Sequence, residues 1–428
     1  MARKMKDSGI EWIGEIPEGW EIKRLGAILQ ERNEVNNPIQ TTSILSLTNN
    51  RGVIPYSEKG NQGNKAKDDL TGYKIAHIGD IVLNSMNVII GSVGLSNYYG
   101  AVSPVYYMLF PRNNIETNIQ YYNYLFQTTA FQQSLRGYGN GILEIRMRIQ
   151  MQKLKTVLLP VPTFLEQSNI TVYLDASLSK LNILLSKIRS SIEEYKKLKQ
   201  AVITQAVTKG VRGEREMKDS GVGWIGAIPK DWEIKRLKSF CTIVDCKNRT
   251  PDVFPDGKYT VVRTTCIKDC SFSYEGSYQT DTTNFKAWTL KGQPHKGDIF
   301  FTREAPVGEA CLVPNADNLC MGQRVMFFRP EDNSDSRYIM YSIYGPLVRE
   351  YIASKNSGST VGHLKLGQVA CIPIFYCPPL EQKEIADYLD AKCAEIDGLI
   401  AKKEQLVKEL ESYKKSLIYE VVTGKREV

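Results

Sequence analysis

Cysteine is missing from the whole first half of the chain, because all nine cysteines lie between Cys241 and Cys393. A disulfide or zinc framework common to the whole chain is therefore excluded, and reduced, unpaired thiols are expected. Cys241 with Cys246, or Cys266 with Cys270, could hold a metal, although no second His or Cys pair completes a usual site. No apolar run approaches the roughly 18 residues of a membrane-spanning helix. The N-terminal segment lacks a secretory signal, so we expect a cytoplasmic protein.

Motifs that would carry chemistry are also missing. There is no GxxxxGK[ST] loop for nucleotide phosphates, and the glycine cluster at 137–141 lacks the dinucleotide-binding spacing. Asp252, Asp256 and Lys258 resemble a nuclease pattern, but they crowd into one segment that an ordinary turn explains better. The three histidines occupy unrelated positions (His77, His295 and His363). These absences favour a protein without its own catalytic or metal site, and an unrecognised active site stays the alternative.

What the chain does contain is a long internal repeat. MKDSGIEWIGEIPEGWEIKRL at 5–25 returns as MKDSGVGWIGAIPKDWEIKRL at 217–237, with 16 identical positions. We call these stretches the first and second WIG segments. A second matched pair, 165–210 and 380–425, follows at a constant offset of 215, while the segments between look almost unrelated. Matched segments at both ends of each half, with unrelated segments between them, indicate one scaffold that presents two different binding specificities.

The charge of the chain is biased toward polyanion binding. The formal net charge is +8. Lys and Arg outnumber Asp and Glu by 14 to 9 in residues 21–160 and by 18 to 15 in residues 233–376. The tail from 377 to 428 is acidic, with 9 basic and 11 acidic residues. The basic character of the two variable segments is compatible with nucleic acid without being diagnostic of it.

The two matched C-terminal blocks carry an apolar seam with alternating three-four spacing, which predicts two long helices. Each would span about 43 residues, or about 65 Å. An apolar seam of this length needs a partner helix, and the duplication supplies one, so we expect the two helices to pair as an antiparallel coiled coil. Lys199 and Lys414 interrupt the seam at matched positions. A parallel homodimeric coiled coil is the alternative. The seam residues are Leu174, Leu178, Leu181, Leu185, Ile188, Ile192, Leu389, Ile396, Ile400, Val407, Leu410 and Leu417.

The variable segments read as mixed α+β globules rich in strands. In both, a Gly-Asp turn precedes a short apolar strand, at 78–83 and at 296–301. A second matched strand ends at a proline (105–111 and 325–330), and aromatic-rich, helix-like stretches follow at 121–136 and 336–354. Shared strands with unlike loops predict a common core and different binding surfaces.

Residues suited to reading DNA cluster after the matched strands and in a late loop of each segment. Duplex recognition uses Arg and Lys on phosphates and Arg, Asn, Gln, Ser or Thr on base edges. Any single one of them is equally explained as a solvated side chain, so the prediction concerns the clusters. The first segment offers Asn84, Ser85, Asn87, Arg136, Tyr138, Asn140, Arg146 and Arg148. The second offers Lys247, Asn248, Arg249, Arg263, Thr264, Thr265, Arg303, Lys355, Ser357, Ser359, Thr360, His363 and Lys365.

Together these features resemble the specificity subunits of type I restriction–modification systems over essentially the whole chain. The resemblance is carried by the repeated WIG-x-IP-x-x-W-E-I-K-R-L, the Gly-Asp-Ile strand, and the helix starts Leu165-Glu166-Gln167 and Leu380-Glu381-Gln382. It is carried further by Tyr-Leu-Asp at 173–175 and 388–390 and by the helix exits at 206–208 and 421–423. The first helix start departs slightly, with Thr163-Phe164 where the second has Pro378-Pro379.

The resemblance implies an α+β fold with two globular target-recognition domains that have mixed, β-rich cores. Two long repeated helices would separate them, pairing as an antiparallel coiled coil in a pseudo-twofold internal repeat. The expected segments are 1–25 (N-terminal conserved segment), 21–163 (first recognition domain), 164–210 (central conserved helix), 211–237 (second conserved entry segment), 233–378 (second recognition domain) and 379–428 (C-terminal conserved helix).

The resemblance also implies a subunit without a catalytic site. Each recognition domain would read one half of a bipartite double-stranded DNA site, and the helices would set the spacing and dock two modification (methyltransferase) subunits. S-adenosylmethionine, ATP and Mg are expected on partner subunits, with restriction (translocase) subunits as further partners and no membrane. A non-enzymatic coiled-coil adaptor that binds protein or other ligands is the alternative. The target sequence and spacer length are not readable from the chain.

Overall fold

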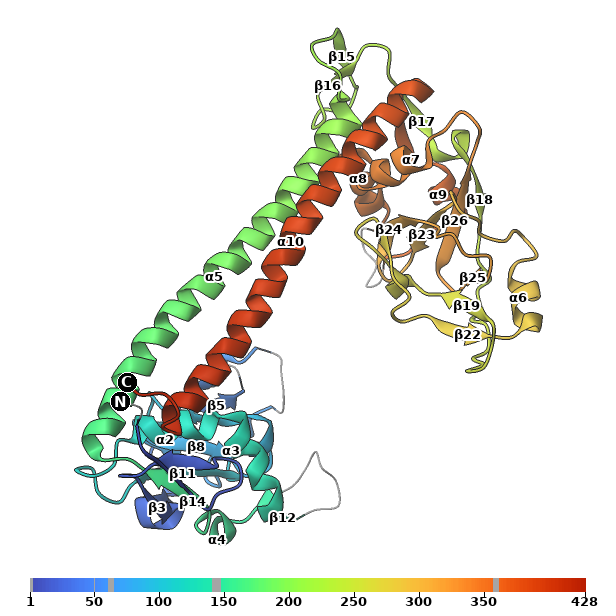
Figure 1. Ribbon diagram of the computed structural model, residues 1–428. Helices are drawn as coiled ribbons and strands as arrows, with labels where there is room; N and C mark the ends of the chain where they lie inside the picture. The colour runs from blue at the N-terminus through green and yellow to red at the C-terminus, as the bar shows by residue number, and fades with distance from the viewer. Residues whose placement is uncertain (1–2, 50, 61–64, 141–147, 357–361) are drawn as a thin grey trace. The chain divides into compact units, whose positions relative to one another are not determined.

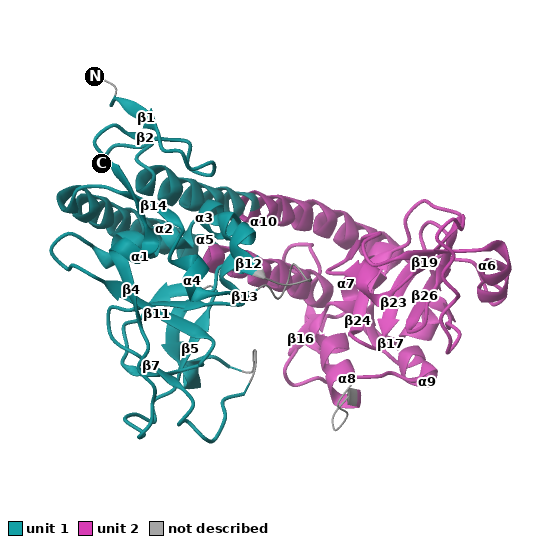
Figure 2. Ribbon diagram, turned by 90° about the horizontal axis from the view of Figure 1, so that it is seen from below, with its two compact units in different colours: residues 1–188, 405–428 teal, residues 189–404 magenta. Residues whose placement is uncertain are grey.

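The computed structural model describes residues 3–49, 51–60, 65–140, 148–356 and 362–428. They form two compact units (Figure 2). Each unit has its own hydrophobic core. Unit 1 contains residues 1–188 and 405–428, and unit 2 contains residues 189–404. The expected mixture of helices and strands is present, while the domain boundaries drawn along the sequence stay a prediction. None of the described helices combines the length and apolar character needed to cross a bilayer.

Most elements of unit 1 precede the first long helix (Figure 1). The strands are β1 (Met5–Asp7), β2 (Glu15–Pro17), β3 (Glu21–Arg24), β4 (Leu29–Arg32), β5 (Leu45–Thr48), β6 (Gly52–Pro55), β7 (Lys74–Ala76), β8 (Ile81–Asn84), β9 (Val93–Leu95), β10 (Gly100–Val102), β11 (Tyr106–Pro111), β12 (Gly139–Asn140), β13 (Arg148–Ile149) and β14 (Leu158–Val161). The helices are α1 (Leu25–Ile28), α2 (Ile119–Gln127), α3 (Thr129–Ser134), α4 (Met151–Leu154) and the long α5 (Phe164–Lys209), which continues into unit 2.

Unit 2 repeats this order with a different insertion. The strands are β15 (Met217–Asp219), β16 (Ala227–Pro229), β17 (Glu233–Arg236), β18 (Cys241–Val244), β19 (Tyr259–Val262), β20 (Ile267–Lys268), β21 (Ser271–Phe272), β22 (Tyr278–Thr280), β23 (Ile299–Arg303), β24 (Val307–Leu312), β25 (Leu319–Met321), β26 (Val325–Pro330) and β27 (Pro373–Tyr376). The helices are α6 (Thr282–Trp288), α7 (Ser336–Ile343), α8 (Pro346–Asn356), α9 (Leu366–Ala370) and α10 (Pro379–Val422), which continues into unit 1.

A four-stranded antiparallel sheet lies at the centre of each unit. Its order is β4-β11-β8-β9 in unit 1 and β18-β26-β23-β24 in unit 2. The strands that the sequence predicted after Gly-Asp are β8 and β23, and the predicted strands that end at proline are β11 and β26. Because the order is the same in both units, the ends of β8 and β23 are equivalent places in two separate sheets.

The Gly-Asp turns have the structural role that the sequence predicts for them. Both glycines have positive φ, +86° at Gly79 and +93° at Gly297, a conformation that side chains other than glycine rarely adopt. The buried carboxylate that follows accepts the backbone N–H of the residue three positions earlier and pairs with an arginine of the same sheet. These contacts are Asp80 with His77 and Arg32, and Asp298 with His295 and Arg329.

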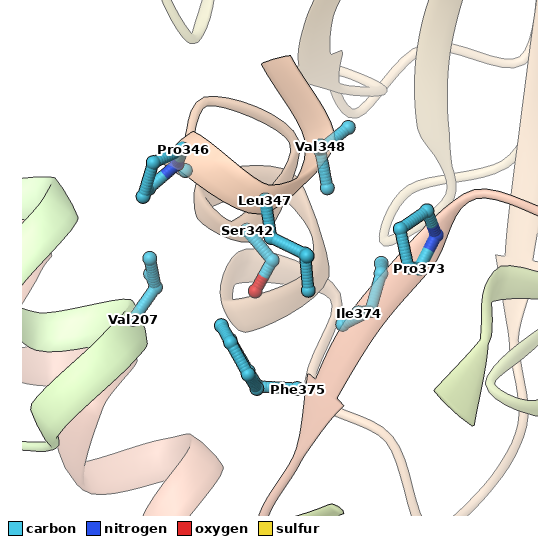
Figure 3. Close-up of a pocket in the computed structure, with 9 residues that line it drawn as sticks. Val207, Ser342, Pro346, Leu347, Val348, Pro373, Ile374 and Phe375 are labelled. Atoms are coloured by element: carbon cyan, nitrogen blue, oxygen red, sulfur yellow. The ribbon is translucent and has the colours of Figure 1, made fainter. Parts of the chain in front are cut away.

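The two predicted helix-like stretches are each broken into two helices. In unit 1 Thr128 is extended, and its hydroxyl accepts the Phe131 N–H as the cap of α3. In unit 2 the break falls at Gly345, just before Pro346 starts α8. A Cβ at Gly345 would lie 2.8 Å from Cγ2 of Val207 on α5, so glycine permits close packing there. Val207 and Pro346 line a small cavity here, which Figure 3 shows in close-up. Its volume is about 10 Å³, roughly one water molecule in size.

The long helices have 46 residues (α5) and 44 residues (α10), as the apolar period predicts. All the seam residues are buried or half-buried. Within unit 1, Lys414 Nζ donates to Asn182 at 2.8 Å. Within unit 2, Lys199 Nζ pairs with Asp397 at 2.6 Å, and Lys403 lies over the ring of Tyr195. In unit 2 the partner on α10 falls from Lys403 to Asp397 as the residue on α5 rises from Tyr195 to Lys199, so the paired segments run antiparallel there.

Each unit is completed by the start of one long helix and the end of the other. Trp20 and Trp232, from the two WIG segments, are fully buried. An arginine lies over each indole and pairs with the glutamate at the local helix start: Arg3 with Glu166, and Arg215 with Glu381. In unit 1 the end of α10 packs on the WIG segment, since Tyr419 donates to the Trp12 carbonyl and Lys425 to that of Ile13. In unit 2 the end of α5 packs on the second WIG segment in the same way, and Lys209 donates to the Ile225 carbonyl.

Candidate nucleic-acid interface

In unit 1 the predicted polar cluster begins where β8 ends. Asn84 is the last residue of β8, and its carboxamide oxygen accepts the Met86 N–H at 3.0 Å. Asn84 and Asn87 are half-buried, whereas Ser85 is fully buried. The Ser85 hydroxyl donates to the Val105 carbonyl at 2.8 Å, which ties β8 to the segment before β11. Ser85 therefore supports the site, and the two asparagines remain candidates for contact with bases.

The structure brings the late loop of unit 1 to this same strand end. The backbone N–H of Ile149 donates to the Ser85 carbonyl at 3.0 Å, and Tyr107 donates to the Ile149 carbonyl. Ile149 is fully buried, whereas the adjacent Arg148 is exposed. Arg136 is exposed and Tyr138 half-buried in the helical turn before β12, which contains Asn140 and pairs with β13. Arg146 lies outside the described residues.

Unit 2 repeats this connection. The backbone N–H of Leu364 donates to the Arg303 carbonyl at 3.0 Å, at the end of β23. Leu364 is fully buried and lies 215 positions after Ile149, the offset of the long helices. His363 and Lys365 flank it and are exposed, and Lys355 lies at the end of α8 over the ring of Tyr351. Ser357, Ser359 and Thr360 lie outside the described residues.

Arg303 differs from the other candidates because its side chain is buried. Its exposed fraction is 9%. Nη1 donates to both carboxylate oxygens of Asp245, at 3.1 and 3.2 Å, and Nη2 donates to Asn248 Oδ1 at 2.7 Å. The guanidinium is thus engaged inside the protein, and we do not assign it a base contact.

The loop at 245–250 carries the predicted cluster Lys247, Asn248 and Arg249. Its anchors were not predicted: Trp288 Nε1 donates to the Arg249 carbonyl at 3.1 Å, and Lys247 Nζ lies 4.8 Å from the Trp288 ring centroid. Asn248 and Arg249 are exposed. The only signal in the sequence was the polar run directly after a strand, since Trp288 is distant along the chain.

Arg263, Thr264 and Thr265 lie in a different part of unit 2, in the turn after β19. Arg263 and Thr265 line an open cleft of about 740 Å³ together with Lys199 and Asp397. None of the residues bonded to Arg303 lines this cleft. The structure therefore separates Arg263 and Thr265 from the predicted residues at the end of β23, and the place at the end of β23 matches the polar cluster of unit 1.

A metal centre has no support among the described residues. No group of three or more His, Cys, Asp or Glu side chains is placed to hold an ion in that part of the chain. All nine cysteines are free thiols. Burial raises the pKa of the Cys241, Cys246, Cys266 and Cys270 thiols.

Known proteins of similar sequence carry names from one family. The family model of the type I restriction modification DNA specificity domain matches twice, at residues 17–194 and 229–409. A protein of Methanocaldococcus jannaschii provisionally named the MjaX type I restriction enzyme specificity subunit is 26% identical, over 96% of this chain and 95% of its own. The MjaVIII specificity subunit of the same organism is 24% identical, over 96% and 93%.

Solved structures share the fold. A chain from a structure of a type I restriction–modification system aligns with a TM-score of 0.72 at 15% identity, covering 96% of this chain and 99% of the other. The HsdS subunit from Thermoanaerobacter tengcongensis aligns with a TM-score of 0.50 at 15% identity, covering 96% and 98%. The repeated family match covers most of both units. The chain therefore belongs to the type I restriction–modification DNA specificity family.

Proposed function

We propose that this chain is the sequence-specific DNA-binding subunit of a type I restriction–modification complex, in which each unit reads one half of a bipartite site. The observation that carries the proposal is the repeated family match, combined with polar clusters at equivalent ends of two equivalent sheets. The frame of the two units is shared, whereas the exposed residues around it differ. Different residues on one frame suit two different half-sites.

We infer that α5 and α10 pair along their seam as a coiled coil and so set the distance between the half-sites. Antiparallel contacts in unit 2 and a seam whose residues are buried or half-buried support this inference. Helices of 46 and 44 residues measure about 65–70 Å at 1.5 Å per residue. Half-sites one DNA turn apart lie about 34–36 Å from centre to centre, which is within that reach.

We propose the outer faces of the same helices as docking surfaces for two modification subunits. Leu165 and Leu380 are 69% and 67% exposed, and Tyr173 and Tyr388 are 36% and 40% exposed. Each pair is separated by 215 residues. The repeat has kept the same apolar side chains at exposed positions while the loops around them diverged, which is the pattern expected for one kind of partner bound twice.

In this proposal the chain performs no chemistry itself. The partner subunits would bring S-adenosylmethionine for adenine methylation, and restriction subunits would bring ATP and Mg for translocation and cleavage. The complex would act on double-stranded DNA in the cytoplasm. A coiled-coil adaptor for protein ligands is the competing function, because the long helices alone would suit it equally well.

Salt titration separates these functions. A protein that neutralises several phosphates loses affinity with a slope of about −0.9 per phosphate contacted in a plot of log K against log salt. We expect the chain, co-expressed with its modification subunit, to bind duplexes that carry its target with such a slope. The target comes from mapping methylated adenines in cells with and without the chain. A flat salt dependence or no duplex binding would refute the proposed function, and methylation or cleavage by the purified chain alone would refute the non-catalytic role.

A further inference from the structure

The contact between Arg303 and Asn248 determines how the Asn248 side chain is presented. Arginine has N–H donors and no acceptor, so the Asn248 atom that faces the guanidinium at 2.7 Å must be the carboxamide oxygen. The amino group of Asn248 then points away from Arg303. Among the described residues no acceptor is hydrogen-bonded to that amino group. Asn248 is exposed, so its N–H donors are available to a ligand.

The backbone beneath Asn248 is fixed from several sides. Gln323 Nε2 donates to the Asn248 carbonyl at 3.5 Å, and Thr250 Oγ1 donates to Gln323 Oε1 at 3.4 Å. The Trp288 indole holds the next residue by its carbonyl. The loop has no regular secondary structure, but hydrogen bonds from Gln323 and Trp288 anchor two successive carbonyls of its backbone. A positioned donor on a held loop is the geometry that discriminates between base edges.

We propose that Asn248 is a base-reading residue of unit 2 and that Arg303 is the positioning residue that sets its donor face outward. In the major groove an amide donor recognises an acceptor, which is N7 of a purine, O6 of guanine or O4 of thymine. It disfavours cytosine, whose exposed group there is itself a donor. This inference rests on the proposed function and specifies one contact within it.

Two substitutions test the two roles separately. Asn248→Asp keeps the size and the contact with Arg303, but it replaces the outward donor with an acceptor. We expect its preference to move toward a base that presents an amino group, with affinity for the original target about tenfold lower, inside the range for one good base contact. Arg303→Met removes the positioning contact, and we expect it to weaken discrimination at that same base pair.

Arg329→Met is the control, because Arg329 also pairs with a carboxylate of unit 2: its Nε and Nη2 donate to the two oxygens of Asp298, at the opposite end of β23. The measurement is the relative affinity of the assembled complex for duplexes that carry each single-base change in the target. The half-site read by unit 1 is an internal control for folding. We expect Arg329→Met to leave the base preferences of both half-sites unchanged.

The outcomes distinguish the inference from the proposed function. Wild-type discrimination that survives Asn248→Asp unchanged would overturn the reading role. A change in Arg303→Met at a different base pair from that of Asn248→Asp, or spread evenly over both half-sites, would overturn the positioning role. A wild-type complex without sequence preference would refute the proposed function itself. If Arg303→Met does not fold, Asn248→Asp still tests whether Asn248 reads a base. The positioning role is then tested with Arg303→Lys, which keeps the positive charge, in place of Arg303→Met.

Discussion

Replacing Gln382 by methionine removes a buried link between the start of α10 and the start of α7. The Gln382 side chain is fully buried. Its amino group donates to the Cys377 carbonyl at 2.9 Å, and its oxygen accepts the Asp335 N–H at 3.0 Å. Asp335 in turn caps α7 by accepting the Arg337 N–H at 2.8 Å. Methionine has a similar length and fills the same space, but it satisfies neither backbone group.

The expected cost follows from the two groups left without a partner. A buried donor or acceptor that loses its hydrogen bond costs about 1–3 kcal/mol. Two such groups give about 2–6 kcal/mol, from which a small gain for the apolar methionine must be subtracted. We therefore expect Gln382→Met to lower the free energy of unfolding of unit 2 by about 3 kcal/mol. Unit 1 has the same link through Gln167 to Asn118 and Pro162, so Gln167→Met should behave alike there.

Urea denaturation and amide hydrogen exchange measure this effect together. The free energy of unfolding comes from denaturation, and exchange at Asp335 and along α7 reports the local loss. Gln405→Met is the control, because Gln405 is exposed on the same helix and, among the described residues, bonds only to the Glu409 side chain. We expect it to change the free energy of unfolding by no more than about 0.5 kcal/mol. A loss below that limit for Gln382→Met, with unchanged exchange in α7, would show that this amide does not anchor the helix.

Three further predictions concern the seam, the modularity of the units and acid stability. Ile396→Asp should destabilise unit 2 by several kcal/mol, because Ile396 is 5% exposed and the substitution would bury a charge there. An unchanged melting temperature would contradict a buried seam. Exchanging residues 26–157 for the equivalent segment of a related protein should change one half of the methylated sequence, and mapped methylation in which both halves change would contradict two separate readers. Burial raises the pKa of Glu166, but hydrogen bonds from Trp20 and Arg3 outweigh burial and hold the pKa below its usual 4.5. The stabilisation by this ionised carboxylate is therefore present above about pH 4.5 and is lost as the pH falls through the lowered value. Denaturation curves against pH should lose this component in Glu166→Gln, and an unaltered acid dependence would argue against it.

The sequence predicted those features whose cause is local. The three-four spacing of leucines fixes which face of α5 and α10 is buried, since it depends only on the helical period. The Gly79-Asp80 and Gly297-Asp298 turns were predicted for the same reason, because a glycine with positive φ and a carboxylate that accepts a nearby N–H act within a few residues.

Features that depend on distant partners could not be predicted in this way. Arg303 was a candidate for DNA contact by its place after a strand, yet its partner Asp245 lies 58 residues earlier, and only the folded chain reveals that the pair is buried. Tyr419 and Trp12, which are 407 residues apart, are joined by a hydrogen bond that no spacing rule could suggest. The contacts of the candidate residues with DNA stay a prediction.

The place of the end of α10 in unit 1 has a consequence for the order in which the two units fold during synthesis. The core of unit 1 includes Leu417, Val421 and Val422, and Tyr121 donates to the Val422 carbonyl at 2.8 Å. A ribosome must therefore synthesise the chain as far as Val422 before unit 1 can be completed, although that unit begins first. Unit 2 ends at residue 404 and has all its residues earlier. Unit 2 should thus finish folding before unit 1. A messenger RNA truncated after the codon for residue 404 should yield a chain in which unit 2 is complete and unit 1 is not.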